Sequence, residues 1–176
     1  MTLTNAQHGN LKNIILVGFM AAGKSSVGRT LARELGWDFL DTDSEIEKVT
    51  GMKIPDMFRK YGEVRFRSEE NLVIKKLKDI TYTVIATGGG SILFEENRRL
   101  LEELGMMVHL YVPVDVALQR VKRRQDRPLF NKSLSEIQKL WQERLVIYNQ
   151  IPITIDTSAR SIEEIAEEIL AIVKGG

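Results

Sequence analysis

The sequence predicts a single three-layer α/β/α domain in which helices cover both faces of a five-stranded parallel sheet. Five short apolar segments alternate along the chain with segments of helical periodicity, which is the pattern of parallel strands joined by crossover helices. The first apolar segment leads directly into a glycine-rich turn and then a helix. The length of 176 residues, without a linker, repeat or low-complexity stretch, suits one domain.

Periodicity and turn residues predict the individual elements. Apolar runs bounded by turn residues predict strands at residues 13–18, 38–40, 82–86, 107–112 and 153–156. Apolar residues at helical spacing predict helices at residues 24–35, 44–49, 54–60, 63–77, 95–104, 114–123, 135–150 and 162–173. Gly36 and Gly51 follow helices at the position where glycine commonly ends them, and Gly62 separates two helices. The polar residues 1–12 predict an N-terminal tail.

The overall composition narrows the class of protein. A formal net charge of +1 gives no broad positive field for nucleic acid or a membrane surface. The chain has no cysteine, which excludes disulfides, thiolate metal sites and cysteine nucleophiles. No apolar run approaches the roughly 20 residues of a membrane span, and the N-terminus lacks the apolar segment of a signal peptide. We therefore expect a cytoplasmic protein, and a monomer because no apolar helix face stands out.

The glycine-rich turn after the first strand carries the clearest chemical signal. Residues 18–25, GFMAAGKS, fit the pattern G-x-x-x-x-G-K-[ST] of a phosphate-binding loop, rather than an ordinary glycine turn, and lie between a strand and a helix. Small side chains let successive backbone N–H groups surround phosphate oxygens. Lys24 is expected to contact the β- and γ-phosphates of ATP, and the Ser25 hydroxyl to bind Mg²⁺. The predicted nucleotide-binding residues of this loop are Ala21, Ala22, Gly23, Lys24, Ser25 and Ser26.

The phosphate loop alone leaves the second substrate open. The chain is short for a motor or transporter ATPase, and the strand segment VIATG at 84–88 lacks the acidic residue that those proteins usually carry there. The segment NKSL at 131–134 lacks the aspartate of a guanine-binding N-K-x-D motif. A kinase for a small molecule is the remaining class.

Residues at the ends of the second and third strands are candidates for the acceptor site. Asp41 and Asp43 lie at i and i+2, where an open α/β sheet binds ligands, so one carboxylate could serve Mg²⁺ and the other acceptor hydroxyls. The alternative is a helix cap, since Asp43 or Ser44 precedes the next helix. Three consecutive glycines, Gly88 to Gly90, follow the third strand and indicate a close approach to a ligand.

The motifs GFMAAGKS, DTD, GEVRFRSEE, TGGG, RPLF and ERLVIY, in this order and at these spacings, resemble those of the shikimate kinase family. The resemblance extends over residues 14–173. It implies a P-loop kinase fold with an acceptor-binding region at about residues 44–77 and a mobile lid at about residues 122–134. The implied reaction is phosphorylation of the shikimate 3-hydroxyl by ATP and Mg²⁺, on the pathway to chorismate and the aromatic amino acids.

The resemblance also implies roles for individual side chains on the acceptor side. Asp41 would lie near Mg²⁺, and Asp43 would bind the acceptor hydroxyls. Arg67 and Arg144 would bind the acceptor carboxylate, which suits the planar fork of arginine better than lysine. Without the resemblance, Arg67 could equally belong to a solvated helix face with ion pairs to nearby glutamates. The implied acceptor-binding residues are Asp43, Arg67, Gly88, Gly89, Gly90 and Arg144.

On the nucleotide side, the resemblance implies Arg120 against adenine, Arg160 at a nucleotide contact and Arg127 on the lid over ATP. The implied catalytic residues are Lys24, Asp43 and Arg127. Two positions depart from the family pattern. Ala21 stands where glycine is usual, so we expect it to avoid a positive φ, and Ile162 stands where the adenine loop often has proline.

Two other functions stay open at this point. A related kinase could phosphorylate gluconate or a nucleoside monophosphate, and gluconate also carries a carboxylate. A non-catalytic ATP-binding module would not need the acceptor residues, which argues against it. His109, Trp37 and Trp141 are expected to be packing residues rather than ligands.

Overall fold

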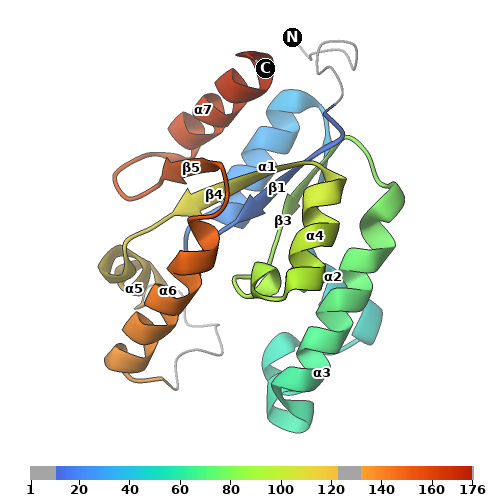
Figure 1. Ribbon diagram of the computed structural model, residues 1–176, viewed down its shortest axis with the longest axis vertical. Coiled ribbons are helices and arrows are strands. Elements are labelled where there is room, and N and C mark those ends of the chain that lie inside the picture. The colour runs from blue at the N-terminus through green and yellow to red at the C-terminus, as the bar shows by residue number, and fades with distance from the viewer. Residues whose placement is uncertain (1–10, 123–131, 176) are drawn as a thin grey trace.

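The computed structural model describes residues 11–122 and 132–175. Within these ranges the chain forms one five-stranded parallel sheet, as predicted, with the strand order β2-β3-β1-β4-β5 (Figure 1). The strands are β1 (Asn13–Val17), β2 (Asp38–Asp41), β3 (Thr83–Ala86), β4 (Met106–Tyr111) and β5 (Ile153–Asp156). Arg127 and most of the predicted lid lie outside the described residues.

Helices follow each strand, as the sequence predicts. Their bounds are α1 (Lys24–Leu35), α2 (Thr42–Thr50), α3 (Ile54–Lys76), α4 (Glu95–Leu104), α5 (Val114–Lys122), α6 (Leu134–Tyr148) and α7 (Ile162–Gly175). Short 3₁₀ turns, Leu77–Asp79 and Ser91–Leu93, precede β3 and α4. The two helices predicted on either side of Gly62 are confirmed as two arms of α3, which bends where Gly62 adopts φ 77° and ψ 179°.

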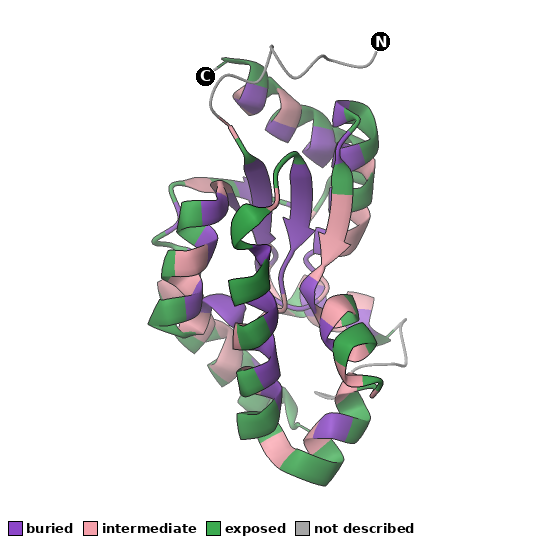
Figure 2. Cartoon of the chain, turned by 90° about the vertical axis from the view of Figure 1, so that its right-hand side faces the viewer, coloured by how far each residue is buried: buried purple, intermediate pink, exposed green. Residues whose placement is uncertain are grey.

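The strands form the core of the molecule. All five residues of β1 are buried, because its neighbours on both sides and helices on both faces cover it (Figure 2). Helices α1 and α7 pack against each other on one face, whereas α4 and the end of α3 lie together on the other (Figure 1). A second, smaller apolar cluster joins α2 to α3 through Ile46, Met57, Phe66 and Val73. No helix of the described chain is long and apolar enough to cross a membrane.

The register of the sheet brings three loops to one edge. Leu16 of β1 pairs with Ala86 of β3, and Ala86 pairs with Asp41 of β2, so the three strands end side by side. Thr87 then bonds back to β1, since its N–H and hydroxyl both donate to the Leu16 carbonyl, at 3.1 and 3.0 Å. The Gly88 N–H donates to Thr42 Oγ1 at 3.1 Å. The phosphate loop, the aspartate pair and the glycine segment therefore meet where parallel α/β sheets bind ligands.

Candidate active site

Two cavities open at this edge of the sheet, and the phosphate loop borders both. The larger, of about 590 Å³, lies between the loop, α2, α3, the glycine segment and α6. The smaller, of about 300 Å³, lies between the loop, α5 and the turn from β5 to α7. Ala21, Gly23 and Ser26 line both cavities. A ligand that spans the loop would thus reach from one cavity into the other.

Lys24 is folded back over the phosphate loop. Its ammonium donates to the carbonyls of Gly18 at 2.7 Å and Phe19 at 2.9 Å, and the residue is 8% exposed. The ammonium also lies at the wall of the larger cavity. Because the loop itself fixes this cation at the start of α1, it is placed where the backbone N–H groups of the loop and the helix N-terminus already favour an anion.

The expectation that Ala21 avoids a positive φ is wrong. Ala21 adopts φ 56°, in the left-handed region that costs an L-residue roughly 1–2 kcal/mol. Its carbonyl accepts a hydrogen bond from Arg120 Nη1 at 3.0 Å. The closed path of the loop between β1 and α1 dictates this backbone angle, so alanine carries strain here that glycine would avoid.

Ser25 and Asp41 together offer oxygen ligands for a divalent cation. The Ser25 hydroxyl donates to Asp41 Oδ2 at 2.5 Å, and both residues line the larger cavity. No group of three or more His, Cys, Asp or Glu residues that could hold a metal occurs in the described part of the chain. This sparse set fits Mg²⁺, which keeps several waters and takes its other ligands from nucleotide phosphates.

Asp41 ends β2 in extended backbone, whereas Asp43 lies in the first turn of α2, so the two carboxylates do not share one extended segment. Asp41, and neither Asp43 nor Ser44, caps the helix, because its Oδ1 accepts from Asp43 N at 3.0 Å and Ser44 N at 3.2 Å. The predicted caps, Asp43 and Ser44, are therefore wrong. Asp43 still lines the larger cavity, since the first turn of α2 directs it there.

Each residue of the glycine segment leaves room for a different acceptor-side residue. A β-carbon on Gly88 would lie 2.8 Å from Asp43 Oδ1. On Gly89 it would lie 3.2 Å from an Arg144 nitrogen, and on Gly90 only 2.4 Å from an Arg67 nitrogen. The segment therefore brings Asp43, Arg67 and Arg144 around one backbone stretch, which side chains larger than hydrogen would push apart.

Arg67 is held between two carboxylates of its own helix. Its Nη1 donates to both oxygens of Glu70, at 2.9 and 3.1 Å, and its Nε and Nη2 donate to Glu63 Oε1 at 3.3 and 3.2 Å. Glu70 is fully buried and also accepts from the Ser91 hydroxyl at 2.8 Å. Burial raises the Glu70 pKa, while the Arg67 charge opposes that rise. Arg67 is therefore more than the member of a solvated helix face.

Arg144 differs from Arg67 in its electrostatic partners. Its guanidinium lies 5.7 Å from the ring centre of Phe19 in the phosphate loop, and its Nε is buried without a hydrogen-bond partner. It makes no salt bridge with any carboxylate in the described ranges. Burial lowers the Arg144 pKa, and the nearby charge of Arg67 lowers it further. Arg144 therefore gives the α6 side of the larger cavity a cation that a carboxylate ligand would neutralise.

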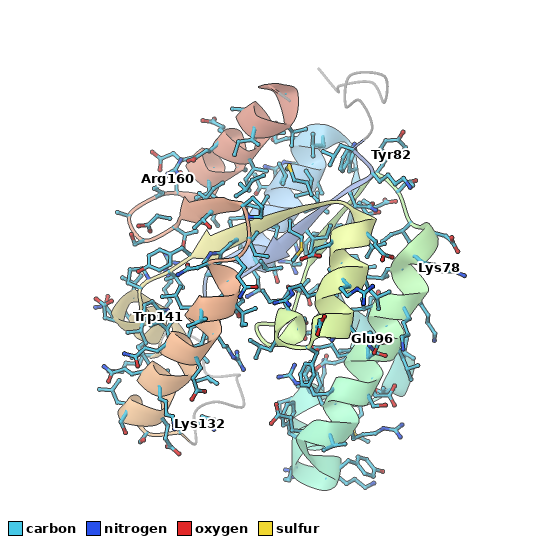
Figure 3. All side chains as sticks on the ribbon, viewed as in Figure 1. Lys78, Tyr82, Glu96, Lys132, Trp141 and Arg160 are labelled. Carbon is cyan, nitrogen blue, oxygen red and sulfur yellow. The ribbon has the colours of Figure 1, made fainter. Side chains whose placement is uncertain are left out.

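Two of the predicted nucleotide-side arginines, Arg120 and Arg160, line the smaller cavity. Arg120 donates to Ala21 O at 3.0 Å and to Thr157 O at 2.6 Å, so it joins the phosphate loop to the turn after β5. Arg160 lies on that turn near the start of α7 (Figure 3), where it donates to Glu164 O at 3.1 Å and pairs with Glu168. Ile162 adds an apolar wall.

The residues expected to be packing residues are confirmed as such. His109 is 1% exposed, and burial lowers its pKa to about 4, helped by the charge of Lys24. Trp37 is buried with its ring edge against Tyr82. Trp141 lies on α6 and donates from Nε1 to Val112 O at 3.0 Å (Figure 3).

Comparison with known proteins identifies the family. A family model described as shikimate kinase matches residues 20–174. The chain belongs to the shikimate kinase family. A shikimate kinase of Pelotomaculum thermopropionicum is 42% identical, over 93% of this chain and 96% of the relative. That of Acinetobacter baumannii (strain AYE) is 43% identical, over 93% and 92%.

Solved structures agree with this assignment of the family and the fold. A shikimate kinase from Acinetobacter baumannii, solved in complex with shikimate, has a TM-score of 0.91 at 40% identity, with 98% of each chain covered. A gluconokinase from Sinorhizobium meliloti has a TM-score of 0.59 at 20% identity, which shows a shared fold alone. The predicted P-loop kinase fold is therefore confirmed.

Three contacts within this shikimate kinase site were not predicted from the sequence. Glu70 holds Arg67, Phe19 lies beneath Arg144, and the Tyr148 hydroxyl bonds to the Gly89 carbonyl. The spacing of three residues between Arg67 and Glu70 was a usable signal, because such residues are neighbours on a helix. The contacts of Phe19 and Tyr148 join distant segments, so no local pattern indicates them.

Proposed function

We propose that this protein transfers the γ-phosphoryl group of ATP to the 3-hydroxyl of shikimate. The observation that carries the proposal is Arg144, a half-buried cation without a described carboxylate partner, in the cavity that the phosphate loop also borders. A carboxylate acceptor would neutralise it beside a second arginine, Arg67. Bidentate pairing with arginine is strong when water is excluded, which favours a planar carboxylate over a neutral acceptor.

The nucleotide would extend across the phosphate loop between the two cavities. Residues 21–26 would surround its phosphates, and Lys24 would move its ammonium from loop carbonyls to phosphate oxygens. Arg120 and Arg160 would border the adenine end. Ser25 and Asp41 would hold Mg²⁺, which supplies neutralisation of phosphate charge when bound.

Asp43 would orient the acceptor hydroxyl. It lines the same cavity as Lys24 and the two arginines, and its carboxylate lies next to Gly88. Because phosphoryl transfer passes through a loose transition state, alignment of the hydroxyl contributes more than early removal of its proton. Gly88, Gly89 and Gly90 would let the acceptor approach the backbone. Arg127, outside the described residues, would add a charge from the lid.

The acceptor-binding region at about residues 44–77 and the single-domain organisation stay part of the proposal. The separate apolar cluster of α2 and α3 supports such a region, since it gives these helices their own packing beside the cavity. A cytoplasmic monomer is likewise proposed, and sedimentation of the purified protein would measure its mass in solution.

The direct test is ADP release from ATP and Mg²⁺ with shikimate, gluconate, AMP or buffer in parallel. Turnover with shikimate alone is the expected result. Turnover with gluconate or AMP would keep the phosphate loop and overturn the acceptor assignment. Nucleotide binding without turnover in every reaction would favour a non-catalytic module.

A variant of Arg144 tests the observation itself. Arg144→Ala should raise the KM for shikimate about 10- to 150-fold, because a hydrogen bond to a charged group contributes about 1.5–3 kcal/mol. The matched control is Arg65→Ala, since Arg65 is an exposed arginine that pairs with Glu69 outside the cavity lining. A shikimate KM equal in both variants would remove Arg144 from the acceptor site.

A further inference from the structure

Tyr148 connects two parts of the acceptor site through one hydroxyl. It lies one helical turn after Arg144, on the same face of α6, and is 2% exposed. Its hydroxyl donates to the Gly89 carbonyl. The Arg144 guanidinium approaches the same hydroxyl, and its positive charge counters the burial that raises the Tyr148 pKa. A single oxygen thus contacts both an acceptor-side arginine and the centre of the glycine segment.

The sheet fixes the orientation of the Tyr148 ring. The ring stacks on His109 of β4, with centres 5.0 Å apart and planes inclined by 25°. His109 is itself buried, and its Nδ1 lies 3.3 Å from the Thr154 hydroxyl of β5. Because two strands hold the imidazole, the phenol has little freedom to turn away from Gly89.

Gly89 occupies the narrow space between the acceptor arginine and the phosphate loop. Its missing β-carbon would face Arg144 at 3.2 Å, Gly18 O at 3.5 Å and Met20 N at 3.6 Å. A shift of the Gly89 peptide would therefore change the spacing between the two halves of the site. Burial raises the Tyr148 pKa to about 12, so the hydroxyl keeps its proton and remains a donor to this peptide at neutral pH.

We propose that Tyr148 is a positioning residue that holds Arg144 and the Gly89 peptide at a fixed separation from the phosphate loop. The inference rests on the proposed function, because it assigns Arg144 to the acceptor carboxylate. Tyr148 acts through these two groups and not by contact with the reacting atoms. It therefore governs acceptor binding much more than nucleotide binding.

Tyr148→Phe tests the proposal because it removes the hydroxyl and keeps the stacked ring. The expected result is a shikimate KM raised about tenfold, with the KM for ATP within about twofold of wild type. Tyr111→Phe is the matched control, since that ring also faces His109, at 6.2 Å, and its hydroxyl bonds to no residue in the described part of the chain. It should leave both KM values unchanged.

A second measurement separates positioning from general loosening. In an Arg144→Ala background, Tyr148→Phe should raise the shikimate KM by much less than in wild type, because one of its two partners is gone. KM does not depend on the fraction of active enzyme, so partial unfolding leaves the comparison valid.

Two results would overturn the proposal while leaving the proposed function intact. One is a shikimate KM within about twofold of wild type in Tyr148→Phe, and the other is an equal rise in both KM values. A wild-type protein that does not turn over shikimate would instead overturn the proposed function, and this inference with it.

Discussion

The phosphate loop draws its ligand-facing groups from residues 18–25, whereas the acceptor side collects Asp43, Arg67 and Arg144 from three helices. In the proposed function the loop would bind mainly through its backbone, so its geometry follows from the path between β1 and α1. The acceptor side would bind through side chains, which need partners to hold them and glycines to make room. A substitution in one half should therefore change the function of that half and leave substrate binding by the other half nearly unchanged.

Lys24→Met should break the phosphate half alone and give the largest effect. Removing one charge that stabilises a transferring group typically lowers kcat about 10²- to 10³-fold. The shikimate dissociation constant, measured by calorimetry without nucleotide, should stay within about threefold, because the Lys24 ammonium donates to carbonyls of the loop.

Lys78→Met is the control for Lys24→Met. Lys78 lies in the 3₁₀ turn before β3 (Figure 3), outside the lining of both cavities. It should keep kcat near the wild-type value. If Lys24→Met retained kcat within tenfold, the ammonium would not act on the transferring group.

Alanine substitutions in the glycine segment should break the acceptor half. In Gly90→Ala the new β-carbon must displace the Arg67 guanidinium, which raises the shikimate KM by about 10- to 100-fold. Gly88→Ala and Gly89→Ala should follow in that order, because their distances to Asp43 and Arg144 are longer. Displacing Arg67 also weakens its bonds to the buried Glu70 carboxylate, so Gly90→Ala should lower the stability of the folded state as well.

Steady-state KM values for both substrates and thermal unfolding would check this order. Gly175→Ala is the matched control, since a β-carbon there meets nothing within 4 Å. A KM for ATP that rose as much as the KM for shikimate would contradict the separation of the two halves.

The difference between the contiguous phosphate loop and the dispersed acceptor side also explains which parts of the site the sequence could predict. The strands and the phosphate loop are encoded in contiguous residues, so their patterns were sufficient. The segment DTDSE offers several capping residues in succession, and the structure caps α2 with the first of them, Asp41, which also accepts from Ser25 of α1. Sequence position alone did not reveal this.

The acceptor side was predicted only as far as individual side chains. The bond between Tyr148 and Gly89 joins residues 59 positions apart, and the sheet register creates it. The prediction that Ala21 avoids a positive φ was wrong for a different reason. The closed path of the loop overrides the preference of alanine for a negative φ. The conformational preferences of single residues therefore predict unconstrained backbone, but they do not predict backbone angles that the tertiary structure forces on a residue.

His109 interacts with both halves of the site. It stacks on Tyr148 of the acceptor side, and the charge of Lys24 in the phosphate loop lowers its pKa. Its pKa falls to about 4 in the folded state, below the usual value of 6.5, so the unfolded chain binds more protons between these values. Stability is thus present above pH 6.5 and lost as the pH falls towards 4. Between pH 7 and pH 5 the free energy of unfolding should fall by about 1–2 kcal/mol.

Urea unfolding of wild type and His109→Phe at both pH values would isolate this loss. The phenyl ring keeps the stack on Tyr148 but cannot titrate. The free energy of unfolding of His109→Phe should therefore fall less between pH 7 and pH 5 than that of wild type. Equal pH dependence in both would assign the loss to carboxylates elsewhere.

The smallest effect concerns the backbone of the phosphate half. Ala21 carries φ 56°, which glycine adopts without strain, although glycine also gains freedom in the unfolded chain. Relief of strain in the folded state should outweigh the added entropy of the unfolded chain. Ala21→Gly should therefore be more stable than wild type by about 0.5 kcal/mol, or roughly 1–2 °C in Tm. Ala22→Gly, at a 1% exposed neighbour outside the positive-φ region, should instead destabilise. If both substitutions lowered Tm equally, strain at Ala21 would not contribute, and the phosphate loop would accept alanine at no measurable cost.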